Sequence, residues 1–369
     1  MKIRIERKEL LKAINVIESA LPTKTVIDSL KGIKIEAINN SIKFTTSKQD
    51  LAICYTVKEN FEIESEGIII IPGFHLITIV RKTEEDYFTI EKVENNSILK
   101  TNKSKINLLD YDKSSYPEID FSKENLKNIV IDKKILKDSY NKVKYSVSNS
   151  NIKPILTGIN YKINNDSLKV SSTDARRLSL TTFDFITNTE GEFTIFRPLL
   201  GILIKILEFT EHKEINLFYN SNQIIIEDGD TILKARLIEG NYPDITRLVP
   251  NEFKFSFNVD ARKIYSILEK ITILSDRDNG NVTLEIKDSQ LIVKSYFKEL
   301  GAIEEICNID SLNGNPFNIS FDPRFLMDSI NSIGEDNINL GFVDEISPFK
   351  IVGLDKTDNI QIISPIRMT

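Results

Sequence analysis

The sequence predicts an α+β fold made of three similar domains in tandem, each combining helices with antiparallel sheet. The tetrapeptide YPEI at 116–119 returns as YPDI at 242–245, 126 residues later in a chain of 369. Pro72, Pro198 and Pro323 each follow an alternating stretch and precede an apolar helical stretch, and they are 126 and 125 residues apart. Independent features that recur at one spacing indicate a repeat, here about a third of the chain.

Each repeat is predicted to open with a short strand that leads into an amphipathic helix. Alternating residues give way to apolar residues at helical spacing, which is typical of a helix covering a core. This pattern occupies residues 3–21, 128–148 and 254–275.

The prolines mark a second shared passage, over residues 66–92, 191–219 and 315–343. Each stretch reads as a strand, a proline, an apolar helix, a polar turn and another strand. Proline is tolerated in the first turn of a helix, because its missing N–H would have no partner there. We therefore predict the same strand-to-helix junction in every repeat.

A β-hairpin is predicted between these two passages, over residues 41–57, 167–183 and 290–307. Each stretch alternates, breaks at a polar turn and alternates again. Cys54 and Cys307, 253 residues apart, fall in the same predicted strand of the first and third repeats. This position favours small core side chains over reactive thiols.

We place the domains at residues 1–123, 124–253 and 254–369. The boundaries lack the Gly/Pro-rich or low-complexity linkers that join loosely tethered domains. We therefore expect the domains to pack rigidly, with sheets able to continue from one domain into the next. The YPEI and YPDI segments are predicted to be one turn, used near the end of the first two domains.

The composition indicates a globular protein, with 41 % hydrophobic and 28 % charged residues. No apolar run approaches the roughly 18 residues that cross a bilayer. The opening MKIRIERKELLK lacks the apolar core of a secretory signal. Two cysteines cannot form a disulfide framework and fit a reducing compartment, so we expect a cytoplasmic protein.

No motif in the sequence indicates an enzyme. The sequence contains neither a phosphate-binding G-x-x-x-x-G-K-[ST] loop nor a G-x-G-x-x-G after a strand. The two histidines, His75 and His212, form no pair with metal-ligand spacing, and a hydrolytic nucleophile usually needs a positioned histidine. We therefore predict no catalytic residue, no metal and no cofactor.

Three motifs resemble those of one family. They are T-D-x-x-R-L at Thr173–Leu178, Y-P-D-x-x-R-x-x-P at Tyr242–Pro250, and P-I-R at Pro365–Arg367. Together with the threefold repeat, they make the whole chain similar to the bacterial DNA polymerase III β subunit, the sliding clamp. The resemblance implies a head-to-tail homodimer that closes a six-domain ring around double-stranded DNA, with helices lining the hole and sheets outside. It also implies partners: the polymerase III α subunit, the clamp loader and other clamp-binding proteins.

The net charge of −6 argues against a generic nucleic-acid binder, but a clamp is expected to be basic inside and acidic outside. The helix predicted within 133–144 carries five lysines and one aspartate, which favours phosphate contacts without sequence readout. A merely solvated helix face is the alternative. The predicted DNA-contacting residues are Lys133, Lys137 and Lys142, with Lys24 and Arg197 added by the resemblance.

The resemblance further implies an apolar pocket where partner proteins dock a short peptide. For its apolar members, Leu156 and Ile346 above all, a core role is the alternative. Family members often have histidine at Arg176 and methionine at Ser364 and Ile366, so peptide preference is expected to differ; the rim near Asn279 is polar here. The predicted pocket residues are Leu156, Thr173, Arg176, Arg177, Leu178, Pro243, Arg247, Leu248, Asp322, Phe325, Ile346, Pro348, Ile363, Ser364, Pro365, Ile366, Arg367 and Met368.

The predicted ring interface pairs edge strands of the first domain of one chain and the third domain of the other. Complementary charge would fix which ends meet, and pairing would cover edges prone to aggregation. Ile106 and Leu108 are expected to face Ile273 and Leu274, and Lys103 and Lys105 to face Glu299, Glu304 and Glu305.

Two other functions are compatible with the sequence. A repeat-built scaffold could bind proteins without encircling DNA, in which case changing the lysines of 133–144 to glutamate would leave its binding unaffected. A hydrolase or transferase using the acidic clusters would instead turn over a nucleotide with metal. Oligomer mass combined with retention on circular DNA would separate the three functions.

Overall fold

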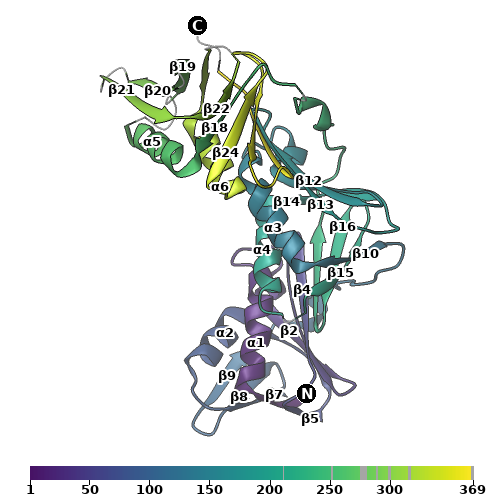
Figure 1. Ribbon diagram of the computed structural model, residues 1–369. Helices are drawn as coiled ribbons and strands as arrows, with labels where there is room; N and C mark the ends of the chain where they lie inside the picture. Colours follow the sequence, from purple (N-terminus) through teal and green to yellow (C-terminus); the bar gives the residue numbers. More distant parts are fainter. Residues whose placement is uncertain are drawn as a thin grey trace. The chain divides into compact units, whose positions relative to one another are not determined.

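The computed structural model describes residues 1–210, 212–250, 252–274, 281–287, 290–297, 301–314 and 317–366. The chain forms two compact units, Met1–Leu136 with Pro198–Leu237, and Lys137–Arg197 with Ile238–Thr369 (Figure 1). The division passes through the middle third of the chain, so each unit joins one terminal repeat to half of the central repeat.

The predicted order of elements recurs three times. In the first repeat the strands and helices are β1 (Lys2–Glu6), α1 (Arg7–Ile17), β2 (Gly32–Ile38), β3 (Ser41–Lys48), β4 (Leu51–Val57), β5 (Phe61–Ser65), β6 (Gly67–Pro72), α2 (Gly73–Lys82), β7 (Tyr87–Val93), β8 (Asn96–Lys100) and β9 (Lys105–Leu109). In the second they are β10 (Lys127–Asp132), α3 (Lys133–Val143), β11 (Gly158–Ile163), β12 (Ser167–Thr173), β13 (Arg177–Asp184), β14 (Gly191–Phe196), α4 (Arg197–Leu207), β15 (Glu214–Tyr219), β16 (Gln223–Asp228) and β17 (Thr231–Arg236). In the third they are β18 (Phe255–Asp260), α5 (Ala261–Leu274), β19 (Val282–Lys287), β20 (Gln290–Phe297), β21 (Gly301–Asn308), β22 (Asp310–Asn313), β23 (Asn318–Phe321), α6 (Pro323–Ile333), β24 (Asn337–Phe342), β25 (Phe349–Gly353) and β26 (Asn359–Ile363).

Antiparallel sheets extend across the repeats, as expected. In the first unit one sheet has the order β10-β15-β16-β17-β4-β3-β2-β6, so the pairing of β17 with β4 joins the second repeat to the first. In the second unit one sheet has the order β14-β11-β12-β13-β26-β25-β24-β18-β22, and the pairing of β13 with β26 joins the second repeat to the third. At each junction the strand that closes the hairpin of one repeat, β4 or β13, pairs with the last strand of the next repeat, β17 or β26.

Each terminal repeat keeps one sheet that ends in an unpaired strand. The sheet β5-β1-β7-β8-β9 of the first repeat ends at β9, and the sheet β21-β20-β19-β23 of the third repeat ends at β21. By their place in the repeat, β9 corresponds to β17 and β26, while β21 corresponds to β4 and β13. The two free edges are therefore the same two kinds of strand that pair at the internal junctions.

Helices cover one face of the sheets. Helix α1 packs on α2, β3 and β4, and helix α5 packs on α6, β18, β20 and β21. Their inward side chains are fully buried, Leu10 and Ile14 in α1 and Ile264 and Leu268 in α5. Burial of an aliphatic side chain contributes about 1.5–3 kcal/mol, so these amphipathic stripes explain why the helices form where the period of 3.6 predicts.

The proline junctions agree with the prediction, with one refinement. Pro198 and Pro323 lie in the first turns of α4 and α6, whereas Pro72 ends β6 and precedes α2 as its cap residue. Cys54 and Cys307 are buried in the corresponding strands β4 and β21. Burial raises the pKa of both thiols, which fits packing residues rather than nucleophiles.

The YPEI and YPDI segments cover the sheets in the same way. Tyr116 packs with Leu30, Ile70 and Ile119, and Tyr242 packs with a cluster that includes Ile245. Across the described part of the chain, no helix is both long and apolar enough to cross a membrane, and no group of metal-binding side chains occurs.

Candidate functional site

The candidate site lies in the second unit, where β13 begins and β26 ends. Arg177 lies opposite Ile363 and Leu178 lies opposite Ile362 in the register of this junction. Consecutive strand residues point to opposite faces of a sheet. The predicted pocket residues on these strands are therefore divided between the two faces of the sheet, at the end where β13 begins and β26 finishes.

The turn before β13 is held by its own side chains. The Thr173 hydroxyl donates to the Arg177 carbonyl at 2.7 Å and accepts from the Ala175 N–H at 3.1 Å. Asp174 Oδ1 accepts from the N–H groups of Arg176 and Arg177 at 2.9 and 3.0 Å. Ala175 has a φ of 73° in the left-handed region, which this hydrogen bonding supports. The T-D-x-x-R-L motif is thus a turn that fixes where Arg177 and Leu178 begin the strand.

An apolar cluster lies on the outer face of the junction. Leu178, Leu180, Ile245 and Ile362 are its buried members, packed against Tyr242, Val249 and Ile360. The 242–249 segment therefore covers the sheet here through Tyr242, Ile245 and Val249, while Arg247 is exposed and pairs with Asp244 at 3.1 Å. Leu156 is also buried, on the short helix Pro154–Thr157.

Apolar side chains around this cluster remain exposed. Leu248 is 53 % exposed, Ile346 64 % and Ile366 40 %. The tail leading to Ile366 is fixed, because the Ser364 N–H donates to the Arg176 carbonyl at 2.8 Å and the Ile366 N–H donates to the Ser320 carbonyl at 2.7 Å. Pro365, between them, and Pro348 are half-buried. Exposed apolar groups that are held in place suit the rim of a docking site.

Two arginines lie over an aromatic ring on the other face. The guanidinium carbons of Arg177 and Arg176 lie 4.4 and 5.4 Å from the centre of the Phe325 ring. Arg177 also pairs with Asp174 at 3.0 Å and with Asp328 at 2.6 Å. Burial raises the pKa of Asp328, and Arg177 opposes that shift. Arg177 is thus paired internally, while Arg176 remains exposed.

Two predicted pocket residues have structural roles. Asp322 caps α6 by accepting from the Arg324 N–H at 3.0 Å, and it also pairs with the Arg324 side chain. Ile363 is fully buried in the core of the third repeat, and it is Ile362 that belongs to the outer cluster. The prediction missed Ile362, although the alternation of β26 from Ile360 would have identified it. Arg367 and Met368 lie outside the described residues.

The predicted DNA-contacting residues separate into two groups. Lys24, on the loop after α1, and Lys137, on α3, are exposed. Arg197 begins α4, half-buried, with Nη2 3.5 Å from the Asn149 side chain. Lys133 and Lys142 form ion pairs within the chain, and their contact with DNA stays a prediction. Lys133 Nζ lies 2.8 Å from the buried Asp228 carboxylate, and Lys142 Nζ lies 2.7 Å from Asp358, so both ammonium groups are held by carboxylates of the protein itself.

The predicted interface residues lie on or near the two free edges. Ile106 and Leu108 are half-buried on β9, and Lys103 and Lys105 are exposed. On β21, Glu304 pairs with Lys294 and Glu305 with Lys270. Ile273 and Leu274 lie at the end of helix α5 rather than on an edge strand, and Ile273 is 77 % exposed; that they face Ile106 and Leu108 of a second copy stays a prediction. Glu299 and the rim position Asn279 lie outside the described residues.

Comparison with protein families assigns all three repeats. Models of the N-terminal, central and C-terminal domains of the DNA polymerase III beta subunit match residues 1–120, 130–244 and 246–367. The chain belongs to the DNA polymerase III beta subunit family.

Individual members of the beta subunit family match along the whole chain. The beta sliding clamp of Streptococcus pneumoniae strain R6 is 28 % identical over 373 residues, covering 98 % of both chains. That of Staphylococcus epidermidis strain RP62A is 27 % identical, covering 100 % of this chain and 99 % of its own. The crystal structure of the Bacillus subtilis DNA polymerase sliding clamp superposes with a TM-score of 0.93 at 27 % identity and full coverage of both chains.

Membership of the beta subunit family confirms the predicted fold and function. The chain is built of three tandem clamp domains and acts as a DNA polymerase sliding clamp, a processivity subunit rather than an enzyme. Which of its residues meet DNA, partner proteins or a second copy is a separate question.

Proposed function

We propose that two copies of the chain close head to tail into a ring, with β9 of each copy pairing with β21 of the other. The strand pairing within the chain supports this proposal, because strands of these two kinds already pair at both junctions between repeats. A closed cyclic assembly repeats one interface at both contacts between the copies and covers the exposed edges of β9 and β21. Lys103 and Lys105 beside β9, and Glu304 and Glu305 on β21, give the two edges opposite charge.

The ring would hold double-stranded DNA without reading its sequence. Lys24, Lys137 and Arg197 are the residues that we propose to contact phosphates. Lysine and arginine contacts to phosphate are sequence-independent and weaken with salt, which suits a ring that slides. Lys133 and Lys142 are omitted because each ammonium already pairs with a carboxylate. We place this activity in the cytoplasm, and we propose domain limits at 123/124 and 253/254.

Partner proteins would dock an apolar peptide where β13 begins and β26 ends. The buried cluster around Leu178 would receive apolar side chains, and the exposed Leu248, Ile346 and Ile366 would close over them. The polymerase III α subunit and the clamp loader are the partners proposed for this groove. Arg176, exposed above Phe325, would meet polar groups of the peptide.

Topology provides the decisive test. The purified protein would be assembled on a nicked circular plasmid with a clamp loader and passed through a gel-filtration column. A ring should remain with the circular DNA and be lost once a restriction enzyme linearises it, and its mass in solution should be twice 42.2 kDa. A monomer retained equally on circular and linear DNA would contradict the proposal.

A further inference from the structure

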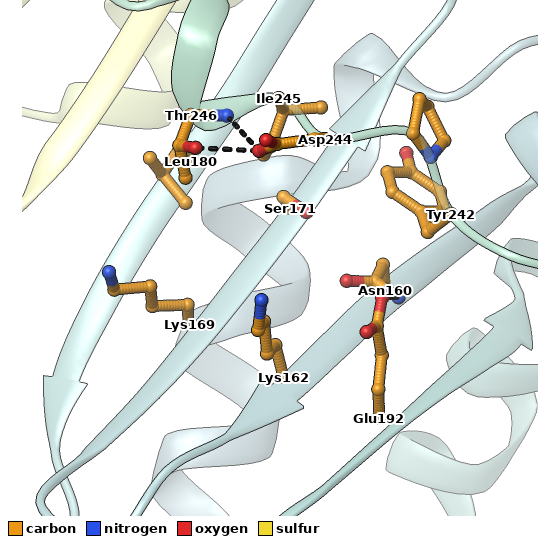
Figure 2. A pocket seen from close by; sticks show the side chains of 11 residues that line it. Asn160, Lys162, Lys169, Ser171, Leu180, Glu192, Tyr242, Asp244, Ile245 and Thr246 are labelled. Atoms are coloured by element: carbon orange, nitrogen blue, oxygen red, sulfur yellow. Dashed lines mark hydrogen bonds between the residues drawn. The ribbon is translucent and has the colours of Figure 1, made fainter.

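A polar cavity adjoins the apolar cluster and shares Leu180 and Ile245 with it, and its lysines are not among the predicted pocket residues. It has a volume of about 110 Å³ and lies on the outer face of β11, β12 and β13, under the Tyr242–Thr246 segment (Figure 2). Its lining includes Lys162, Lys169, Asn160 and Ser171.

Two lysines face each other at the end of this cavity. Lys162 on β11 is the direct register partner of Lys169 on β12, so both side chains lie on one face of the sheet. Figure 2 shows both of them projecting toward the segment that carries Asp244 and Thr246. Like charges directly opposite each other destabilise an antiparallel pair. Lys162 also lies opposite Glu192 on β14 and acts on Asp244, which offsets part of this repulsion, whereas Lys169 lies between Lys162 and Thr182. An anion between the two ammonium groups would relieve the repulsion that remains.

The neighbouring carboxylates are already engaged. Asp244 Oδ1 accepts from the N–H and hydroxyl of Thr246 at 3.2 and 2.6 Å, and Asp244 Oδ2 pairs with Arg247 at 3.1 Å. The Thr246 hydrogen bonds, above all, lower the pKa of Asp244, so this carboxylate is charged and held on its own loop. Glu192, opposite Lys162 on β14, accepts from the Asn160 amide at 3.0 Å. Within the described residues, no carboxylate lies within ion-pair distance of Lys162 or Lys169.

The register connects the lysine pair to the apolar cluster. Successive rows on this face run from Lys162 and Lys169, through Asn160, Ser171 and Leu180, to Thr173 and Leu178. Lys169 is four residues from Thr173, a separation of roughly 13 Å at about 3.3 Å per strand residue. An extended peptide anchored at Leu178 would therefore reach the lysine pair with its fourth residue. Leu180 and Ile245 belong to both the cavity lining and the cluster.

We propose that Lys162 and Lys169 form a subsite for an acidic side chain of the partner peptide, about four residues from its apolar anchor. This inference rests on the proposed apolar docking groove. The carboxylate would lie between the two ammonium groups, and the Asn160 amide and Ser171 hydroxyl line the space beside it. Peptides would thus be selected by charge at one defined distance from the anchor.

The test uses fluorescent decapeptides with a Leu-Leu-Phe anchor and the intact protein. Each carries glutamate or glutamine at the fourth residue before or after the anchor, and binding is followed by anisotropy at low and high salt. One glutamate peptide should bind about threefold to tenfold more tightly than its glutamine twin at low salt, and less so at high salt. The Lys162→Gln/Lys169→Gln variant should abolish this preference while binding the glutamine peptide normally.

The control is Lys287→Gln, which removes an exposed lysine from β19 in the same unit and should keep the preference. Equal affinity for glutamate and glutamine peptides, with binding intact, would overturn the acidic subsite alone. Failure of every peptide to bind would instead remove the docking groove, and the subsite with it.

Discussion

Leu178 and Ile362 lie opposite each other across the junction of β13 and β26, 184 residues apart in the sequence. Leu178 comes from the second repeat and Ile362 from the end of the third, so one apolar cluster depends on two domains. The docking groove that we propose at this position would form only where the repeats join. Strand β26 therefore both joins the third repeat to the nine-stranded sheet and contributes Ile362 to the apolar cluster.

The exposed rim of the groove gives the first prediction. Replacing Leu248, 53 % exposed, by serine removes an apolar contact without opening the core. We expect affinity for an apolar partner peptide to fall about fivefold to twentyfold, the effect of losing an interface anchor. Isothermal titration would measure the affinity, and the melting temperature should stay unchanged. Ile186→Ser, which replaces a side chain that is 92 % exposed after β13, is the matched control and should bind normally.

The buried ion pair gives the second prediction. Asp228 has a fully buried carboxylate, and Lys133 Nζ lies 2.8 Å from it, also donating to the Thr210 carbonyl at 3.0 Å. Lys133→Met would leave that carboxylate with only the Thr210 hydroxyl and the His212 ring as polar partners, and removing one partner of a buried ion pair typically costs about 3–5 kcal/mol. Urea unfolding should show a loss of this size. Lys134→Met, at the exposed neighbouring position, should leave stability nearly unchanged; similar losses for both variants would argue against the ion pair as the cause.

Sequence patterns predicted most of the elements because periodicity is a local property. They could not predict which lysine of the 133–134 pair is buried, since that depends on Asp228, 95 residues away. The alternation from Ile360 indicates that Ile362 lies on the face of the cluster, but residue type alone does not separate it from Ile363, because both are apolar and each is buried on its own face. The resemblance pointed to Ile363, and the strand register places its neighbour Ile362 in the apolar cluster.

The division of the predicted pocket residues between the two faces of the sheet likewise depends on the fold. The motif Thr173–Leu178 places Arg177 and Leu178 side by side in sequence, but a strand sends them to opposite faces. Asp328, the partner of Arg177, lies in no motif and only the fold brings it there. The position of Ile273 on α5 likewise follows from the helical period of 254–275 itself, which continues through Leu274.

The third prediction concerns pH. The Asp110 side chain is 3 % exposed, with Lys92 Nζ 3.9 Å away. Burial raises the pKa of Asp110 above its ordinary 3.8, and this outweighs the lowering by Ser97 and Lys92. The folded state therefore binds this proton more tightly than the unfolded chain does, so stability is lost as pH rises through the raised pKa.

Asp110→Asn removes that loss. The variant should melt about 2–4 °C higher than the parent at pH 7, and the gain should shrink as the pH falls toward 4. Thermal melts at equal protein concentration across this range would measure the gain. Asp112→Asn is the control: hydrogen bonds from Ser114 lower the pKa of Asp112, so its replacement should not raise the melting temperature. A gain at Asp110 that is independent of pH would contradict the assignment.

Charge exchange across the proposed ring interface gives the fourth prediction. Lys105 is exposed on β9, and Glu304 is 58 % exposed on β21. Lys105→Glu or Glu304→Lys alone would place like charges across the interface and should weaken the dimer about tenfold in dissociation constant. Combining the two restores opposite charge, so the double variant should recover most of the affinity in sedimentation experiments.

The recovery tests whether opposite charge on the two edges favours the dimer; by the register of the internal junctions, Glu304 would lie opposite Leu109 rather than Lys105. Lys43→Glu, on β3 in the interior of the eight-stranded sheet, makes the same charge change on an exposed residue and should leave the dimer intact. Glu304 also pairs with Lys294 within its own chain, so Glu304→Lys removes that ion pair as well; melting curves would register any loss of stability separately. Additive weakening in the double variant would mean that β9 and β21 do not meet as proposed.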